Sequence, residues 1–187
     1  MDLITLDDYK KAKGILSPKE DERLQYLITS VSQLVKTYCG TSFVDYINVD
    51  KVQNFSVKYS GTYKIQTSEF PLIEVSEILV RDSESSDYYE VTEFELDAES
   101  DYIYRLQKPW PVGVNSVIVS YRAGYEVLPE ELKLVMVDLV HYYLKEEYKS
   151  AKSLHGASIR NQTTSSLRGN LGFPDHIKRV LDLYRNI

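Results

Sequence analysis

The sequence predicts an α+β fold, a small helical bundle with an inserted antiparallel β region and a C-terminal extended arm ending in a helix. Two observations support this prediction. Apolar residues recur at helical spacing near both ends of the first 150 residues, whereas alternating β-branched and aromatic residues dominate between them. Beyond residue 150 the periodicity is lost until a short amphipathic stretch near the end. We therefore expect a domain over residues 1–150, followed by a linker and arm helix over residues 151–187.

Three helices are predicted for the bundle, over residues 5–13, 18–39 and 129–149. Thr5 suits the N-cap of the first helix, and Ser17 with Glu20 has the spacing of a capping box for the second. Gly40 is placed to end the second helix, and Pro129 suits the first turn of the third. The second and third helices carry wide apolar stripes, so we expect them to pack on each other.

The β region is predicted over residues 41–122, where the apolar pattern changes from helical to alternating. An odd number of residues in the turn at Gly61 would set Val57 opposite Ile65. This count favours a three-residue hairpin loop over a two-residue one. Pro71 restricts the following strand, over residues 75–81, because proline is tolerated only at the edge or start of a sheet strand.

Composition places the chain among globular proteins. It has 187 residues, 43% hydrophobic content, a net charge of −6 and one cysteine, which rules out an internal disulfide. No apolar run approaches the roughly 20 residues that cross a bilayer, so no membrane partner is expected. The first residues lack the basic and apolar regions of a secretion signal, which favours synthesis in the cytoplasm.

No pattern indicates catalysis. The sequence contains no glycine-rich phosphate loop, no nucleophile elbow and no paired-cysteine motif. Its three histidines, His141, His155 and His176, lack carboxylates at metal-site spacing, and Cys39 at a helix C-terminus is expected to be a packed residue. An acidic stretch from Asp82 lacks the glycine that a calcium loop requires. No catalytic residue, cofactor or metal site is therefore predicted.

Charge is unevenly distributed along the chain. Residues 82–101 carry nine acids and no base, whereas residues 149–187 carry seven Lys or Arg and two acids. The acidic block favours a solvated hairpin, and its acids would repel DNA phosphates. The basic tail suits either an acidic protein surface or nucleic acid.

The arm helix carries a compact apolar face. Its members are Phe173, Ile177, Val180, Leu181 and Tyr184. This face could be covered by a neighbouring molecule, as the polar linker before it suggests. Alternatively, the helix could pack back on its own bundle and complete the core.

Several segments, in their order and spacing, resemble the head-to-tail connector (portal adaptor) family of tailed bacteriophages. The matching segments are Thr5–Asp8, Asp21–Ile28, Tyr38–Phe43, Phe70–Val75, Trp110–Pro111 and Val119–Lys133. The resemblance covers roughly residues 3–148 and is weakest in the tail.

The resemblance implies a structural adaptor in the virion neck, and no enzyme. Such a protein forms a dodecameric ring on the portal protein, extends the channel for viral DNA and receives a tail or stopper protein. On this reading Glu93, Glu95 and Asp97 would face the channel or a neighbouring subunit, and the arm face would dock on the portal. Two alternatives stay open: another assembly role, such as a stopper or tail-completion protein, and a DNA-binding packaging accessory that uses the basic tail.

Overall fold

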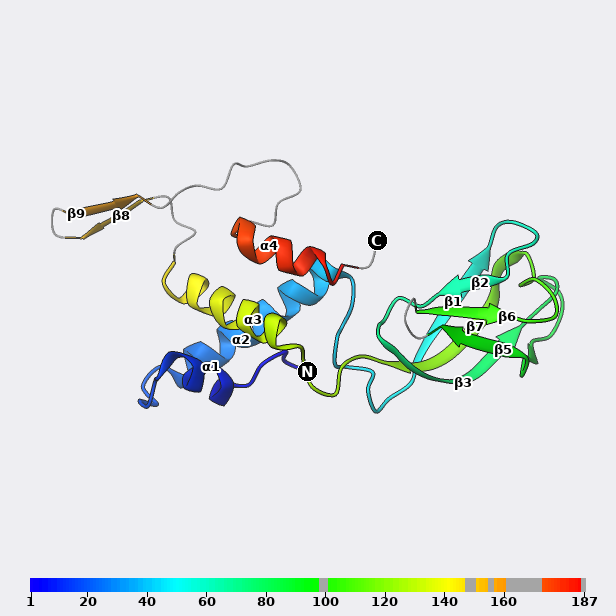
Figure 1. Cartoon of the computed structure of the whole chain (residues 1–187), viewed down its shortest axis with the longest axis horizontal. Helices are drawn as coiled ribbons and strands as arrows, with labels where there is room; N and C mark the ends of the chain where they lie inside the picture. The colour runs from blue at the N-terminus through cyan, green and yellow to red at the C-terminus, as the bar shows by residue number, and fades with distance from the viewer. Residues whose placement is uncertain (98–100, 147–150, 155–156, 161–172, 186–187) are drawn as a thin grey trace. The chain divides into compact units, whose positions relative to one another are not determined.

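The computed structural model describes residues 1–97, 101–146, 151–154, 157–160 and 173–185 (Figure 1). The chain divides into two compact units. A helical unit comprises residues 1–40 and 128–187, and a β unit comprises residues 41–127. This arrangement confirms the predicted α+β class, although the observed division differs from a boundary at residue 150. Within the described residues, no helix has the length and apolar character to cross a membrane.

The helical unit contains α1 (Leu6–Lys13), α2 (Asp21–Cys39), α3 (Glu130–Leu144) and α4 (Asp175–Asp182). Thr5 caps α1 as predicted, and it does so as part of a capping box with Asp8. The Asp8 amide donates to Thr5 Oγ1 at 3.1 Å, and the Thr5 amide donates to the Asp8 carboxylate at 2.9 Å. Gly40 ends α2 in the left-handed conformation, at φ 72°, and its amide donates to the Lys36 carbonyl.

Three predicted helix boundaries were wrong. The capping box at Ser17 does not form, because the Ser17 hydroxyl accepts from the Lys19 amide in a turn and α2 begins only at Asp21. Pro129 takes the N-cap position of α3 instead of its first turn. The same helix stops at Leu144, well before residue 149, because the chain reaches φ 53° at Glu146, a conformation that cannot continue a right-handed helix.

Helix packing forms the core of the helical unit. As predicted, α2 packs against α3, and α4 contacts both of them. The buried side chains include Leu24, Ile28, Val31, Val35, Leu132, Met136, Leu139, Val140, Phe173, Ile177 and Leu181. Tyr9 of α1 is fully buried, and its hydroxyl lies 3.3 Å from His141 Nδ1 on α3. The helical unit therefore covers the apolar stripe of each of its longer helices.

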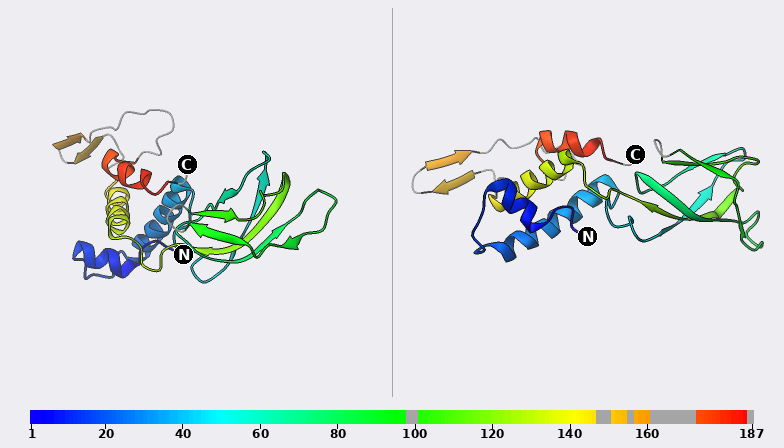
Figure 2. Two further views of the ribbon diagram at one scale, coloured as in Figure 1. Left: turned by 45° about the vertical axis from the view of Figure 1, so that its right-hand side comes forward. Right: turned by 60° about the horizontal axis from the view of Figure 1, so that its bottom comes forward.

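The β unit contains two antiparallel sheets (Figure 2). A four-stranded sheet has the order β1 (Lys51–Val57), β7 (Gly113–Ala123), β3 (Leu72–Val80), β4 (Tyr89–Glu90), and a three-stranded sheet has the order β2 (Lys64–Gln66), β6 (Tyr102–Arg105), β5 (Phe94–Asp97). Both sheets contribute to one core, whose members include Ile65 and Ile103 from the smaller sheet and Ile78, Val117 and Val119 from the larger.

The predicted hairpin between β1 and β2 was wrong. Val57 pairs with Gly113 of β7, and Ile65 pairs with Ile103 of β6, so the two strands belong to different sheets. Val57 and Ile65 nevertheless both belong to the core of the β unit, because a strand can place a side chain on a given face by pairing with any neighbouring strand. Pro71 stands immediately before β3, which agrees with the restriction expected for proline.

The polar stretch after α3 contains a short hairpin. Strands β8 (Ala151–Leu154) and β9 (Ala157–Arg160) form a two-stranded antiparallel sheet, so an extended linker was the wrong prediction for these residues. The rest of the predicted linker, residues 161–172, lies outside the described residues.

Candidate assembly surfaces

The acidic residues singled out in the sequence, Glu93, Glu95 and Asp97, lie on or just before β5. Glu95 pairs with Tyr104 and Asp97 with Tyr102, so both acids share the outer face of the smaller sheet. Glu95 is exposed and Asp97 is half-buried. Glu93 is exposed but precedes the strand and lines a cavity instead. The structure therefore separates Glu93 from the other two acids, and their role at a channel or subunit contact stays a prediction.

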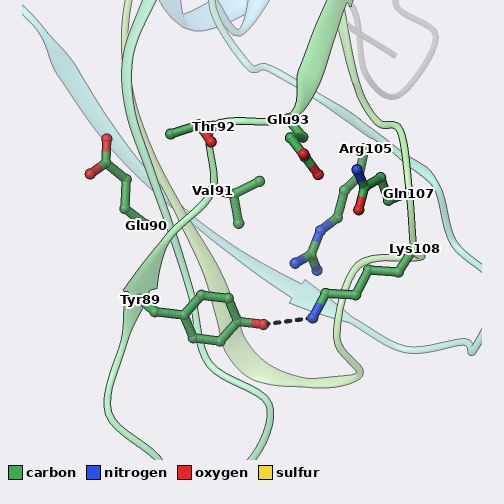
Figure 3. Close-up of a pocket in the computed structure, with 8 residues that line it drawn as sticks. All are labelled: Tyr89, Glu90, Val91, Thr92, Glu93, Arg105, Gln107 and Lys108. Carbon is green, nitrogen blue, oxygen red and sulfur yellow. Dashed lines mark hydrogen bonds between the residues drawn. The ribbon is translucent and has the colours of Figure 1, made fainter.

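A cavity lies beside Glu93 in the β unit (Figure 3). It has a volume of about 180 Å³ and is lined by Tyr89, Glu90, Val91, Thr92, Glu93, Arg105, Gln107 and Lys108. Figure 3 shows the guanidinium of Arg105 and the ammonium of Lys108 directed into it, while the carboxylate of Glu90 points away. The cavity thus presents two cations to one space.

Arg105 is placed in this cavity by strand alternation. It pairs with Phe94 of β5 and lies on the inner face of β6 together with Ile103. Its side chain is only 6% exposed, donates to the Pro109 carbonyl at 3.2 Å and lies 5.5 Å from the ring of Trp110. Within the described residues it forms no ion pair. A buried guanidinium without an acid is costly, so this position is unusual.

Lys108 and Tyr89 complete the cationic side of the cavity. The Lys108 ammonium donates to the Tyr89 hydroxyl at 3.2 Å and lies 5.4 Å from the centre of its ring. The Tyr89 hydroxyl in turn donates to Asp82 at 3.0 Å. Sequence reasoning singled out Glu93 of this cavity but missed Arg105, Lys108 and Tyr89. The available signal was Arg105 itself, a charged residue at an inward position of an alternating strand.

A second charged group buried in the β unit, Glu69, is fully paired. Its carboxylate accepts hydrogen bonds from Thr41, Ser42 and Lys51 at 2.7–2.9 Å. Burial alone would raise the pKa of Glu69, but the Lys51 ammonium and the other donors outweigh burial and hold that pKa below its usual value. This cluster satisfies its charge internally and leaves none for a ligand.

The face of α4 that the sequence offered for docking is covered by the chain itself. Phe173, Ile177 and Leu181 are 0%, 2% and 0% exposed, whereas Val180 and Tyr184 are half-buried. A freely available docking face was therefore the wrong expectation, and the alternative of a helix packed on its own bundle is the observed arrangement. The physical reason is that α2 and α3 leave an apolar surface that α4 fills. Whether α4 contacts a portal protein is a separate question and stays a prediction.

Polar contacts at its C-terminal end fasten α4. The Tyr38 hydroxyl of α2 donates to Asp182 at 2.5 Å, and the Tyr184 hydroxyl donates to Glu131 of α3 at 2.5 Å. Burial, followed by the hydrogen bond to Asp182, raises the pKa of Tyr38 to about 12. Burial and the nearby Asp182 charge also raise the pKa of the Cys39 thiol to about 12, so this thiol suits packing and not nucleophilic chemistry.

Metal-binding chemistry has no support in the described part of the chain, where no group of three or more histidine, cysteine, aspartate or glutamate side chains is arranged to hold an ion. His141 contacts Tyr9, His176 is exposed and His155 lies outside the described residues.

Comparison with protein families decides the class of protein. A family model described as "Head completion protein" matches residues 2–187. The chain belongs to the head completion protein family. A head completion protein of Escherichia phage T5 is 25% identical over 187 residues, covering 100% of both chains. This membership confirms the connector class that the sequence resemblance indicated and identifies a structural protein of the phage head-to-tail neck.

Solved structures show the same fold. A chain in the neck of an empty gene transfer agent (GTA) particle computed with C6 symmetry has a TM-score of 0.58 at 11% identity, with coverage of 99% of this chain and 90% of that one. A chain in the neck of the native GTA particle computed with C12 symmetry has a TM-score of 0.56 at 10% identity, covering 100% and 94%. At such identities the likeness establishes the fold alone.

Proposed function

We propose that this head completion protein assembles as a ring of twelve copies on the portal protein, extends the channel through which viral DNA passes and presents the attachment surface for a tail or stopper protein. The observation that carries the proposal is the family match over residues 2–187. The likeness in fold to a chain of a neck computed with C12 symmetry supports the number of copies. No catalytic role is proposed.

The charge of the β unit supports passage of DNA without binding. Residues 41–127 contain fifteen acids and seven bases. A surface with this balance repels the phosphate backbone, so DNA can slide past without being held. The alternative role as a DNA-binding packaging accessory would have to use the basic tail against this repulsion.

The proposed portal contact involves the end of the chain that carries α4. Because Phe173, Ile177 and Leu181 are covered by α2 and α3, docking through these side chains would require α4 to leave its own bundle. Val180 and Tyr184 are half-buried, and Leu183 is 80% exposed. We therefore propose that α4 stays in place and that its accessible side, centred on Leu183, makes the contact.

Electron microscopy of the full-length protein mixed with its cognate portal tests this function. The expected result is an additional ring of density on one face of the portal. If the protein forms rings that do not bind the portal protein but do bind a preassembled neck, the result would favour the stopper or tail-completion role. A monomer that binds duplex DNA with strongly salt-dependent affinity would favour the packaging accessory and overturn the proposal.

The α4 contact has its own variant. Leu183→Asp should weaken binding to the portal, whereas Leu16→Asp, at a residue that is 95% exposed on the loop after α1, should leave binding unchanged. Equal binding by both variants would remove α4 from the portal contact without affecting the ring assignment.

A further inference from the structure

We propose that the cavity between β4 and β6 is a subunit socket, in which Arg105 and Lys108 receive the carboxylate of Glu95 from a second copy of this chain. The proposal rests on the ring assembly proposed above and specifies one of its contacts. It is carried by the pairing of β5 with β6, by the burial of Arg105 and by the charges that line the cavity.

The buried guanidinium of this cavity is not paired with an acid of the described chain. Arg105 is 94% buried, its polar partner is a neutral carbonyl, and no acid in the described part of the chain pairs with it. Lys108 adds a second cation directed into the same space (Figure 3). Glu93 lines the cavity but forms no ion pair with either cation. The lining holds two cations and two acids, but the Glu90 carboxylate points away from the space (Figure 3), so one further carboxylate directed into it would balance the second cation.

Glu95 cannot fill the socket of its own chain. Phe94 pairs with Arg105 and faces the inside of the β unit, whereas the next residue, Glu95, pairs with Tyr104 on the outer face. Successive side chains of a strand point to opposite faces of its sheet, so Glu95 and Arg105 are directed to opposite sides. Glu95 is exposed, and no ion pair of its side chain occurs in the described part of the chain. It is therefore available to another molecule.

The placement of Glu95 and Arg105 on opposite faces of the smaller sheet suits a cyclic ring. In a closed head-to-tail assembly each subunit presents two different surfaces, and the donor surface of one copy meets the acceptor surface of the next. The smaller sheet of this chain carries an acid on one face and a cationic socket on the other. A repeated Glu95–Arg105 contact would satisfy the buried guanidinium in every subunit at once.

A protein carboxylate fits this cavity better than a DNA phosphate. The cavity is bordered by the exposed acids Glu90 and Glu93 and lies next to the acidic stretch from Asp82. A polyanion would meet these acids along its whole length, whereas one side chain brings a single charge to the two cations. The second copy is the natural source because β5 places its acid outward in every subunit.

Zero-length cross-linking tests the contact directly. Carbodiimide joins a carboxyl to an amine only when the two groups touch, so treatment of rings should link Glu95 to Lys108. Rings assembled from equal amounts of ¹⁴N-labelled and ¹⁵N-labelled protein should give cross-linked peptides of mixed isotope composition, which proves that the link joins two copies. Glu95→Gln should abolish this peptide. A link from Glu93 to Lys108 within one copy, without the 95–108 peptide, would overturn the proposal.

Charge exchange supplies a second measurement. Glu95→Lys and Lys108→Glu should each weaken ring assembly by roughly tenfold or more, because each leaves an unpaired charge at a subunit contact. The double variant should recover most of the loss. The matched control is Glu77→Lys with Lys58→Glu, which exchanges charges at exposed positions of the same unit. Loss of assembly in the control, or no recovery in the double variant, would overturn the contact.

Arg105→Gln tests the buried cation and needs a check of folding. If its thermal midpoint matches the wild type, assembly should weaken as for Lys108→Glu. If it unfolds, the Lys108 variants and the cross-link still decide the proposal. Rings that form without the 95–108 link overturn only the socket, whereas wild-type protein that forms no ring with the portal overturns the proposed function. Duplex DNA affinity that disappears in Lys108→Glu would instead assign the cavity to phosphate.

Discussion

In the helical unit, α2, α3 and α4 cover one another's apolar faces, whereas in the β unit the sheets enclose a guanidinium for which the described chain supplies no acid. Three of the five residues of the helical face that the sequence offered for docking, Phe173, Ile177 and Leu181, are thus buried within the unit. The surface with an unmet physical requirement lies in the β unit. An apolar helix face recognised in the sequence is therefore a weaker guide to an assembly surface than a buried charge that has no acid partner in the folded chain.

Glu69 and Arg105, two buried charged residues of the β unit, differ in how their charges are paired. Glu69 is 5% exposed and accepts from Lys51 and two hydroxyl-bearing residues. Arg105 is 6% exposed and has a single carbonyl and an aromatic ring. Glu69 therefore contributes to the stability of the β unit, whereas Arg105 is the group that we propose to bind a second copy of the chain. The predictions below test this division, beginning with the largest effect.

Removal of the chain after Ser150 should strongly destabilise the helical unit. The cut removes Phe173, Ile177 and Leu181, and each buried side chain of this kind contributes roughly 1.5–3 kcal/mol. Chemical denaturation should show a much lower midpoint for the helical signal. A chain cut after Arg185 keeps α4 and serves as the control. Equal stability of the two truncated proteins would mean that α4 is a detachable arm after all.

Leu139→Ala should cost about 2–5 kcal/mol, because Leu139 is fully buried between the helices. Leu134→Ala is the matched control on the same helix, since Leu134 is 62% exposed. Its free energy of unfolding should stay within about 0.5 kcal/mol of the wild type. Urea denaturation followed by circular dichroism measures both. Similar losses in the two variants would contradict the assigned face of α3.

Glu69→Gln should destabilise the β unit by about 1–3 kcal/mol at neutral pH, because it leaves Lys51 without its acid. Since the folded pKa of Glu69 lies below its ordinary value of 4.5, this stabilisation is present above 4.5 and is lost as the pH falls through the folded pKa. The gap between wild type and variant should therefore close in acid. Thermal unfolding from pH 7 to pH 3 measures it.

The control for Glu69 is Glu74→Gln, at an exposed ion pair with Arg122. Its effect on stability should be close to zero across the same pH range. A gap between wild type and Glu69→Gln that persists unchanged to pH 3 would show that packing, and not charge, is what the substitution disturbs.

Charge reversal at Glu93, Glu95 and Asp97 should have the smallest effect on folding. The first two side chains are exposed, and exposed charges contribute little to stability. Assembly of rings and ejection of DNA should nevertheless be impaired in virions that carry the reversals. Thermal unfolding and plaque formation measure the two effects separately. A fully infectious variant with normal rings would exclude the acidic residues from any assembly role.

Local sequence signals predicted the helices of the helical unit but not all of their boundaries. The Thr5 N-cap, the Gly40 terminator and the apolar stripes of α2 and α3 all depend on residues within about one or two helical turns of each other. The wrong boundaries also have local causes. A turn at Pro18 makes α2 begin later than predicted, and the positive φ of Glu146 ends α3 earlier than predicted. The head-to-tail connector resemblance likewise came from ordered local segments, and the family comparison confirmed it.

By itself, the sequence determined the α+β class, the helices, the inserted strand-rich region and the connector family, because these depend on periodicity and on local motifs. Only the tertiary structure decided which strands pair, that Phe173 is buried, and that Arg105 is buried against a carbonyl. Strand pairing joins residues far apart in the chain, and alternation specifies a face without specifying its partner. Whether a charge is paired depends on every element that packs around it, so no pattern of neighbours along the chain could show that Arg105 has no acid partner among the described residues.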